Sequence, residues 1–217
     1  MMRKLLCCLA LIGLTACADG ARELKEPAEP LGDMKLGHAI VVAPNIVKGP
    51  LSRDATDEEW IASLDNALEE RFRRYQGDKF YHIGVSIEGY VLAQPGVPLV
   101  LSPKSVLILN ATVWDDAAGK KLNTEPEQIT VLEAVSPNTI VGSGLTQSKA
   151  VQLRVLSANA ALKIEQWMRK MQKDKGWFGG PEADAVTAAR IAAEAPAEEE
   201  AAADAPQTAE TALAAAE

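Results

Sequence analysis

Two consecutive segments differ in hydrophobic period, and this change constrains the fold most. Over residues 56–76 apolar side chains recur every three or four positions, which predicts an amphipathic helix. Thr56 and Glu59 have the spacing of a capping box at its start, and Gly77 supplies a stop. Over residues 80–93 the period becomes two, which predicts a strand covered on one face. The residues expected on the covered face are Tyr81, Ile83, Val85, Ile87 and Val91.

Four other segments complete the expected domain. Residues 36–47 are rich in β-branched side chains and predict a first strand, while residues 105–114 and 128–135 predict two more. Residues 121–124 could pair with the strand at 105–114 in place of 128–135. Residues 148–173 have apolar positions near helical spacing and predict a second long helix.

The order of these elements is strand, helix, three strands, helix. Both helices have one apolar face, and so does the strand with the clear period, so the faces must be buried against each other. The sequence therefore predicts an α+β fold: a two-layer sandwich in which two long helices cover one face of a mostly antiparallel sheet of about four strands.

The first sixteen residues predict a secretory signal. Arg3 and Lys4 precede an apolar run at residues 5–14 that is too short to span a bilayer, and small residues follow it before Cys17. We therefore expect the chain to be exported and residues 1–16 to be removed.

Residues 14–17, Leu-Thr-Ala-Cys, resemble the lipobox of bacterial lipoproteins. The resemblance implies cleavage between Ala16 and Cys17, followed by acylation of Cys17, so that lipid would hold the mature protein to a membrane. The alternative is that Cys17 is only a small residue in an ordinary signal peptide. Under enteric sorting rules Ala18 favours the outer membrane over the inner membrane, whereas Asp19 leaves the choice open.

Cysteine usage limits how the exported domain can be stabilised. Cys7 and Cys8 lie in the apolar run and would leave with the signal, and lipid would occupy the sulfur of Cys17. We therefore expect a domain without disulfides or thiolate metal ligands, stabilised by its core alone.

Charge is concentrated in the C-terminal tail. The chain has a formal net charge of −8, and residues 181–217 contain nine acids and one base. Residues 17–180 are therefore nearly neutral, which argues against a nucleic-acid partner because that needs a basic face.

Alanine fills 17 of the 37 tail positions, and Pro196 and Pro206 interrupt them, so we expect a tail without fixed structure. The expected organisation is thus a lipidated cysteine and flexible tether at 17–34, a domain at 35–180 and a disordered tail at 181–217.

A lipobox, a short tether and a strand-helix-three-strands-helix domain are together similar to the layout of small envelope lipoproteins. Examples are the lipopolysaccharide-assembly lipoprotein and the auxiliary lipoproteins of lipid-transporting ABC systems. The similarity covers residues 17 to about 175 and depends on the order of elements, so it transfers no functional residue. It implies an accessory role in envelope assembly or transport.

No catalytic or cofactor motif is evident. His38 and His82 lie on different expected strands and could be cross-strand neighbours that bind zinc. No cysteine remains and no acid recurs around them at ligand spacing, so we expect a surface or edge role and no metal site. The segment Gly142-Ser143-Gly144 lacks the phosphate-loop, dinucleotide and nucleophile-elbow patterns and reads as a hinge. The adjacent acids Asp115 and Asp116 read as a solvated turn. We expect no cofactor and no enzymatic activity.

Two apolar features are candidates for partner contact. One is the loop that contains Pro95, Val97, Leu99, Val100 and Leu101, and the other is the pair Trp177 and Phe178 after the second helix. Residues 99–101 could instead extend a strand, and the aromatic pair could fold back onto the helix.

The leading hypothesis is thus a non-enzymatic lipoprotein on the periplasmic side, at the outer membrane in preference to the inner, that binds an envelope protein or lipid component. The alternative is a carrier that holds a lipid or small ligand between sheet and helices. A periplasmic hydrolase is a second alternative, which would need an acid, serine or histidine to converge in a pocket.

Overall fold

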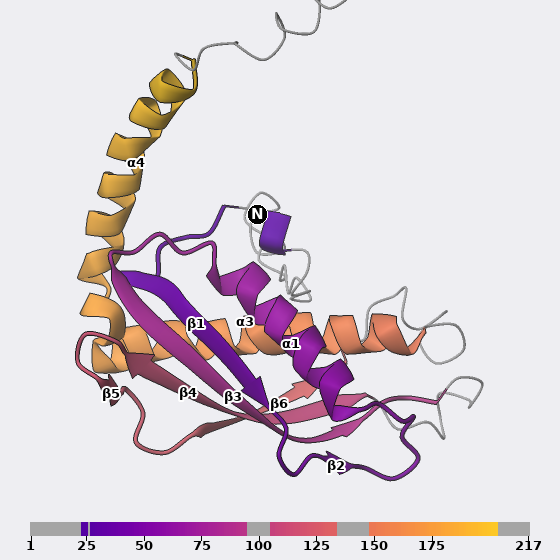
Figure 1. Cartoon of the computed structure of the whole chain (residues 1–217). Helices are drawn as coiled ribbons and strands as arrows, with labels where there is room; N and C mark the ends of the chain where they lie inside the picture. Colours follow the sequence, from indigo (N-terminus) through magenta and orange to yellow (C-terminus); the bar gives the residue numbers. More distant parts are fainter. Residues whose placement is uncertain (1–22, 26, 95–104, 134–147, 204–217) are drawn as a thin grey trace, which may run out of the picture.

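The computed structural model describes residues 23–25, 27–94, 105–133 and 148–203 of the chain, as one six-stranded sheet with helices packed against it (Figure 1). The strands are β1 (Met34–Val42), β2 (Val47–Lys48), β3 (Lys79–Val91), β4 (Val106–Asp115), β5 (Lys120–Lys121) and β6 (Glu127–Leu132). The helices are α1 (Asp57–Phe72), α3 (Lys149–Lys175) and α4 (Glu182–Ala203), with short 3-10 turns at Glu23–Lys25 and Trp177–Gly179.

Helix α1 begins where the sequence predicts. The Thr56 hydroxyl accepts from the Glu59 backbone N–H, and the Glu59 carboxylate accepts from the Thr56 N–H, so the capping box is complete. The predicted stop is wrong: the helix ends at Phe72, with Arg73 as its C-cap. Gly77 serves a close approach instead, because a Cβ there would lie 2.2 Å from backbone atoms of Asp33.

The sheet is mixed. β1 runs parallel to β3, and α1 connects them, whereas β3 with β4 and β4 with β6 are antiparallel. The two short strands extend this pattern, since β2 pairs with β3 and β5 pairs with β4. The sequence offered residues 121–124 and 128–135 as alternative partners of the strand at 105–114. Both regions pair with it, the first through β5 and the second through β6. The prediction of a two-layer α+β fold is confirmed. The hydrophobic period of a strand does not reveal its direction, so it could not predict that β1 and β2 pair with β3 in parallel.

Both long helices lie on one face of the sheet. α1 packs on α3 and on β1, while α3 also packs on β4 and β6. Side chains with no exposed surface fill the boundary between the layers. They are Trp60, Leu64, Leu68 and Phe72 from α1, Leu156, Ala160, Ile164 and Met168 from α3, and Ile83, Ile87, Leu107, Leu109, Val113 and Val131 from the sheet.

A bulge in β3 changes which residues face the helices. The register with β4 shifts between Ile87 and Gly89, and one extra residue reverses the alternation beyond it. Tyr90 is therefore buried, and the prediction that Val91 lies on the covered side is wrong.

Helix α4 corrects the prediction of a tail without fixed structure for residues 182–203. The Asp184 carboxylate accepts from Gly32 N (2.6 Å) and from Gln172 Nε2 (2.8 Å). The Thr187 hydroxyl donates to Gly32 O at 2.8 Å. These polar contacts hold the first turns of α4 against the domain. In Figure 1 the rest of α4 extends away from the sheet. Residues 204–217 lie outside the described residues.

A second irregularity lies in the edge strand β1, where the register with β3 shifts between Leu36 and Ala39. The His82 side chain occupies this position: its Nδ1 accepts from His38 N at 3.0 Å, and its Nε2 lies 2.9 Å from Asp116 Oδ1. A Cβ on Gly37 would lie 2.5 Å from His82 Cε1. Gly37 is therefore required for the imidazole to hold the bulge.

This geometry predicts unequal effects of two glycine substitutions. Gly37→Ala should lower the free energy of unfolding by about 1–2 kcal/mol, because the displaced imidazole loses two hydrogen bonds. Gly84→Ala is the control, since its Cβ would meet only Thr112 O at 3.9 Å, and we expect a change within about 0.5 kcal/mol. Urea denaturation measures both, and equal losses would contradict the account of the bulge.

Candidate functional site

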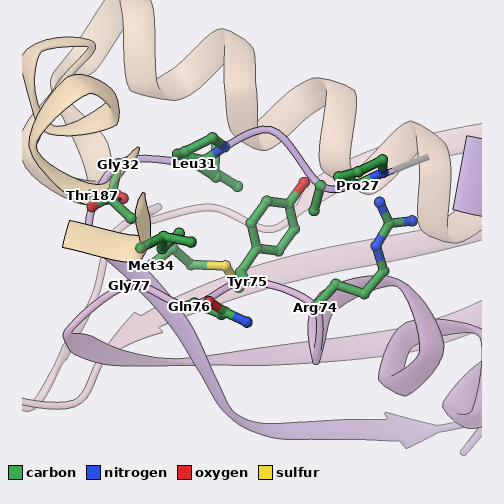
Figure 2. Close-up of a pocket in the computed structure, with 12 residues that line it drawn as sticks. Pro27, Leu31, Gly32, Met34, Arg74, Tyr75, Gln76, Gly77 and Thr187 are labelled. Carbon is green, nitrogen blue, oxygen red and sulfur yellow. Dashed lines mark hydrogen bonds between the residues drawn. The ribbon is translucent and has the colours of Figure 1, made fainter. Parts of the chain in front are cut away.

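A partly open pocket of about 390 Å³ lies where the N-terminal segment joins the domain (Figure 2). Its residues come from three separate places: the segment 27–34, residues 74–77 just after α1, and α4. Leu31, Met34 and Tyr75 are buried, and they form its inner part. The remaining lining residues are Pro27, Ala28, Pro30, Gly32, Arg74, Gln76, Gly77, Thr187 and Ile191.

A polar network joins α1, α3 and the N-terminal segment beside this pocket. Arg71 Nη1 donates to Glu165 Oε2 at 2.5 Å, and the Tyr75 hydroxyl donates to Glu165 Oε1. Arg169 Nη2 donates to the Tyr75 hydroxyl at 3.0 Å, and Arg169 Nη1 donates to Pro30 O at 3.0 Å. The network therefore connects the two helices to each other and to the entering chain.

The same contacts shift the acidity of the network. Burial alone would raise the pKa of Glu165, but hydrogen bonds from Tyr75 and Arg71 and the nearby guanidinium charges outweigh burial and hold its pKa below the usual value. Burial raises the pKa of the Tyr75 hydroxyl, so Tyr75 stays protonated and acts as a donor. Glu165 is thus a buried carboxylate neutralised in place, which suits a structural role.

A tight turn at Gly32 and Asp33 forms the adjoining corner. Asp33 N donates to Phe178 O at 2.9 Å, and the Tyr81 hydroxyl donates to Asp33 Oδ1 at 2.9 Å. The ammonium group of Lys79 lies 2.7 Å from Asp33 Oδ2. Gly32 has φ +57°, and a Cβ there would lie 1.9 Å from Phe178 O, so only glycine fits.

The prediction that Trp177 and Phe178 are exposed for partner contact is wrong. Their side chains are 8% and 2% exposed. Phe178 packs edge-on against Tyr81 with ring centroids 4.8 Å apart, and Trp177 packs edge-on against Trp167 at 5.3 Å. The alternative, in which the aromatic pair folds back onto the helix, is the arrangement observed.

The face of the sheet turned away from the helices carries exposed apolar side chains. Ile40 and Val42 in β1 are 59% and 46% exposed, and Phe80 and Trp114 are also exposed. An open groove of about 450 Å³ runs between Ile40 and Val42 on one side and Trp114 on the other. Apolar groups gathered on one face are a common mark of an interaction surface. Sequence reasoning missed this surface, although the alternation of β1 placed Ile40 and Val42 together.

Of the remaining predicted sites, the histidines and the turn acids lie within the described residues, and the others lie outside them. His38 and His82 do meet: their rings stack with centroids 5.2 Å apart. Within the described ranges no group of three or more histidine, cysteine or acidic side chains is placed to hold a metal ion. Asp115 accepts from Ala118 N and Asp116 contacts His82, as expected of acids in a turn. Cys17 with its cleavage site at Ala16, Gly142-Ser143-Gly144 and the loop residues Pro95, Val97, Leu99, Val100 and Leu101 lie outside the described residues.

The network around Glu165 predicts a pH-dependent stability. Because its folded-state pKa is lowered, the carboxylate stabilises the fold above its unfolded pKa of about 4.3, and this contribution is lost as the pH falls through the folded-state pKa. Glu165→Gln should lower the free energy of unfolding at pH 7 by about 3 kcal/mol and weaken its dependence on pH below about 4.5.

The matched control is Glu70→Gln, an exposed acid on α1, which should change stability by less than about 0.5 kcal/mol. Denaturation at pH 7 and at several acidic values measures both variants. Equal stabilities of the two would show that Glu165 is not held as the contacts indicate.

Comparison with known proteins identifies no family for this chain. No family model matches it, and no curated protein matches it. Among solved structures it is similar to a Xanthomonas campestris protein of the DUF330 family, with 15% identity over 68% of this chain and 94% of that one and a TM-score of 0.38. It is also similar to the PelC dodecamer protein of Paraburkholderia phytofirmans, with 14% identity, 61% and 88% coverage and a TM-score of 0.33. A minor lipoprotein of Acinetobacter baumannii gives 16% identity, 63% and 92% coverage and a TM-score of 0.29.

Proposed function

We propose that this chain is a non-enzymatic envelope lipoprotein that is held to a membrane through Cys17 and binds a partner in envelope assembly or transport. The observation that carries the proposal is the Leu-Thr-Ala-Cys sequence at residues 14–17, which follows a basic and apolar signal. The proposed location is the periplasmic side, at the outer membrane in preference to the inner.

The fold supports an anchored role because it fixes the point where the tether ends. Arg169 binds the carbonyls of Glu29 and Pro30, and the turn at Gly32 and Asp33 is held by α4 and by Phe178. A lipid at Cys17 would therefore restrain one defined end of the domain. None of the helices in the described part has the length and apolarity of a membrane span.

The uncovered sheet face, defined by Ile40, Val42, Phe80 and Trp114, is the surface we assign to partner contact. We assign partner contact to this face instead of to Trp177 and Phe178, because both of those residues are buried. A cargo held between sheet and helices has less support, because fully buried side chains from both layers occupy that boundary.

The lipid anchor is tested by metabolic labelling with a clickable palmitate analogue. Wild-type protein should be labelled and recovered in the membrane fraction, whereas Cys17→Ser should lose at least nine-tenths of the label because no thiol remains to be acylated at the cleavage site. Cys8→Ser, within the apolar run, is the control and should label as wild type does. Equal labelling of wild type and Cys17→Ser would contradict the anchor.

The partner surface is tested by photo-cross-linking in living cells. A benzophenone side chain placed at Val42 should give a discrete adduct with one envelope protein, because Val42 lies exposed in the open groove. The control position is Ala62, which is exposed on α1 in the opposite layer and should give no such adduct. Adducts from Ala62 alone, or the same adducts from both positions, would place the contact elsewhere.

A further inference from the structure

We propose that the free edge of β6 binds an extended segment of a partner protein, which joins the sheet as one more strand. The segment would lie in a groove of about 310 Å³ that opens between β6 and α3. The inference deepens the proposed partner role. It rests on that role only for the partner being an envelope protein, because the mode of binding is argued from the edge itself.

The backbone of β6 has hydrogen-bonding groups that point out of the sheet. Among the strands that the structure describes, β6 pairs with β4 alone, in an antiparallel ladder. Residues in such a ladder alternate between those that bond across it and those whose N–H and C=O groups point away. The Glu133 N–H donates to the Ser105 carbonyl at 2.9 Å, so every second residue back from Glu133 bonds to β4. The backbone groups of Gln128, Thr130 and Leu132 therefore point outward.

These outward groups face an open groove. In the described part of the chain, no group outside the β4–β6 ladder hydrogen-bonds to Gln128, Thr130 or Leu132. The groove is lined on one side by Thr130, Leu132 and Glu133 and on the other by α3, and Leu132 is 55% exposed. Backbone donors and acceptors in this position are the groups with which an added strand pairs.

β6 lacks the features by which sheet edges are protected. Its residues, Glu-Gln-Ile-Thr-Val-Leu, include no proline, lysine or glycine, and its register with β4 has no shift. The edge strand on the other side of the sheet, β1, differs: a bulge interrupts it between Leu36 and Ala39, and it carries the exposed Lys35. Of these two edges, β6 is the one that a further strand can join over its whole length.

The groove also suits the side chains of an added strand, which point alternately to opposite faces. Those opposite Thr130 and Leu132 would continue the uncovered sheet face, to which we assign partner contact. Those between them would point toward α3, where Lys163 and Gln166 are exposed in the groove. A segment with β-branched side chains on one side and polar side chains on the other therefore fits this edge.

A different protein fits the edge better than a second copy of this chain. If two β6 strands paired antiparallel with all three outward residues bonded, Thr130 would lie opposite Thr130 of the second copy. Glu127 would then lie opposite Glu133 at both ends of the pairing. Like charges directly opposite each other are destabilising, whereas a segment with a basic residue opposite Glu127 would be stabilised.

The test uses the mature chain, residues 17–217, with Cys17→Ser, and the peptide acetyl-Thr-Val-Thr-Val-Thr-Val-Lys-amide. Paired antiparallel, its valines lie opposite the three outward residues of β6 and its lysine lies opposite Glu127. One form is N-methylated at positions 3 and 5, which blocks only the peptide edge that faces away from β6. The other is N-methylated at positions 4 and 5, which blocks both edges with the same number of methyl groups.

Calorimetry and the amide signals of Thr130, Leu132 and Gln166 follow binding. We expect saturable 1:1 binding of the form methylated at positions 3 and 5, with the largest shifts at those three amides. It should bind at least tenfold more tightly than the form methylated at positions 4 and 5, because only the first can pair with β6.

A proline variant removes the edge from the protein side. Thr130→Pro deletes one outward N–H and no bond to β4, and an edge strand tolerates proline where the N–H faces solvent. It should keep the parent's circular dichroism spectrum and weaken binding of the first peptide at least tenfold. Thr130→Val keeps the N–H, so it is the matched control and should bind within about threefold of the parent. If Thr130→Pro does not fold, the two peptides still decide the question on the parent protein.

Three results would overturn the proposal: no saturable binding of the first peptide, equal affinity for the two peptides, or unchanged affinity in folded Thr130→Pro. Shifts confined to Ile40, Val42 and Trp114 would do the same, because they would place the peptide on the sheet face. Dimerisation of the chain that Thr130→Pro abolishes would overturn the assignment to a different protein. Cross-linking from Val42 is measured separately, so failure of this edge and failure of the proposed partner face are distinguishable.

Discussion

The turn at Gly32 and Asp33 is the contact on which the arrangement of this molecule depends. It is bonded to the α3–α4 connection through Phe178, to β3 through Tyr81 and to α4 through Asp184. Its backbone conformation requires a glycine, because any side chain at position 32 would overlap the Phe178 carbonyl. A single conformational requirement thus holds together segments about 150 residues apart in the sequence.

Local signals in the sequence predicted the local structure well. The capping box at Thr56 and Glu59 placed the start of α1, and the period of two placed β3, because each depends only on neighbouring residues. The two-layer fold class followed from the apolar faces of these elements. The parallel direction of β1 and the bulge after Ile87 were missed, since alternation is the same for either strand direction and does not report an inserted residue.

Contacts between distant residues explain the errors at the site. An aromatic pair after a basic helix end looked exposed, yet Phe178 is covered by Tyr81, which is 97 positions earlier in the chain. The tail looked unstructured because Pro196 and Pro206 interrupt its alanines and no apolar stripe is evident in it, but Asp184 and Thr187 fix α4 through backbone groups of Gly32. Only one signal pointed to the polar network: Arg71 with Tyr75 and Glu165 with Arg169 are spaced four apart on their predicted helices.

The shared attachment of the tether and α4 at one corner has an electrostatic consequence. If Cys17 anchors that corner to an anionic bilayer, the first turn of α4 starts close to the same surface, while the acids of residues 194–217 are repelled by it. A helix of 22 residues is about 33 Å long, so this repulsion would favour an orientation of the whole domain in which α4 points away from the bilayer. Lowering the salt concentration would strengthen that orientation, and neutral lipids would relax it.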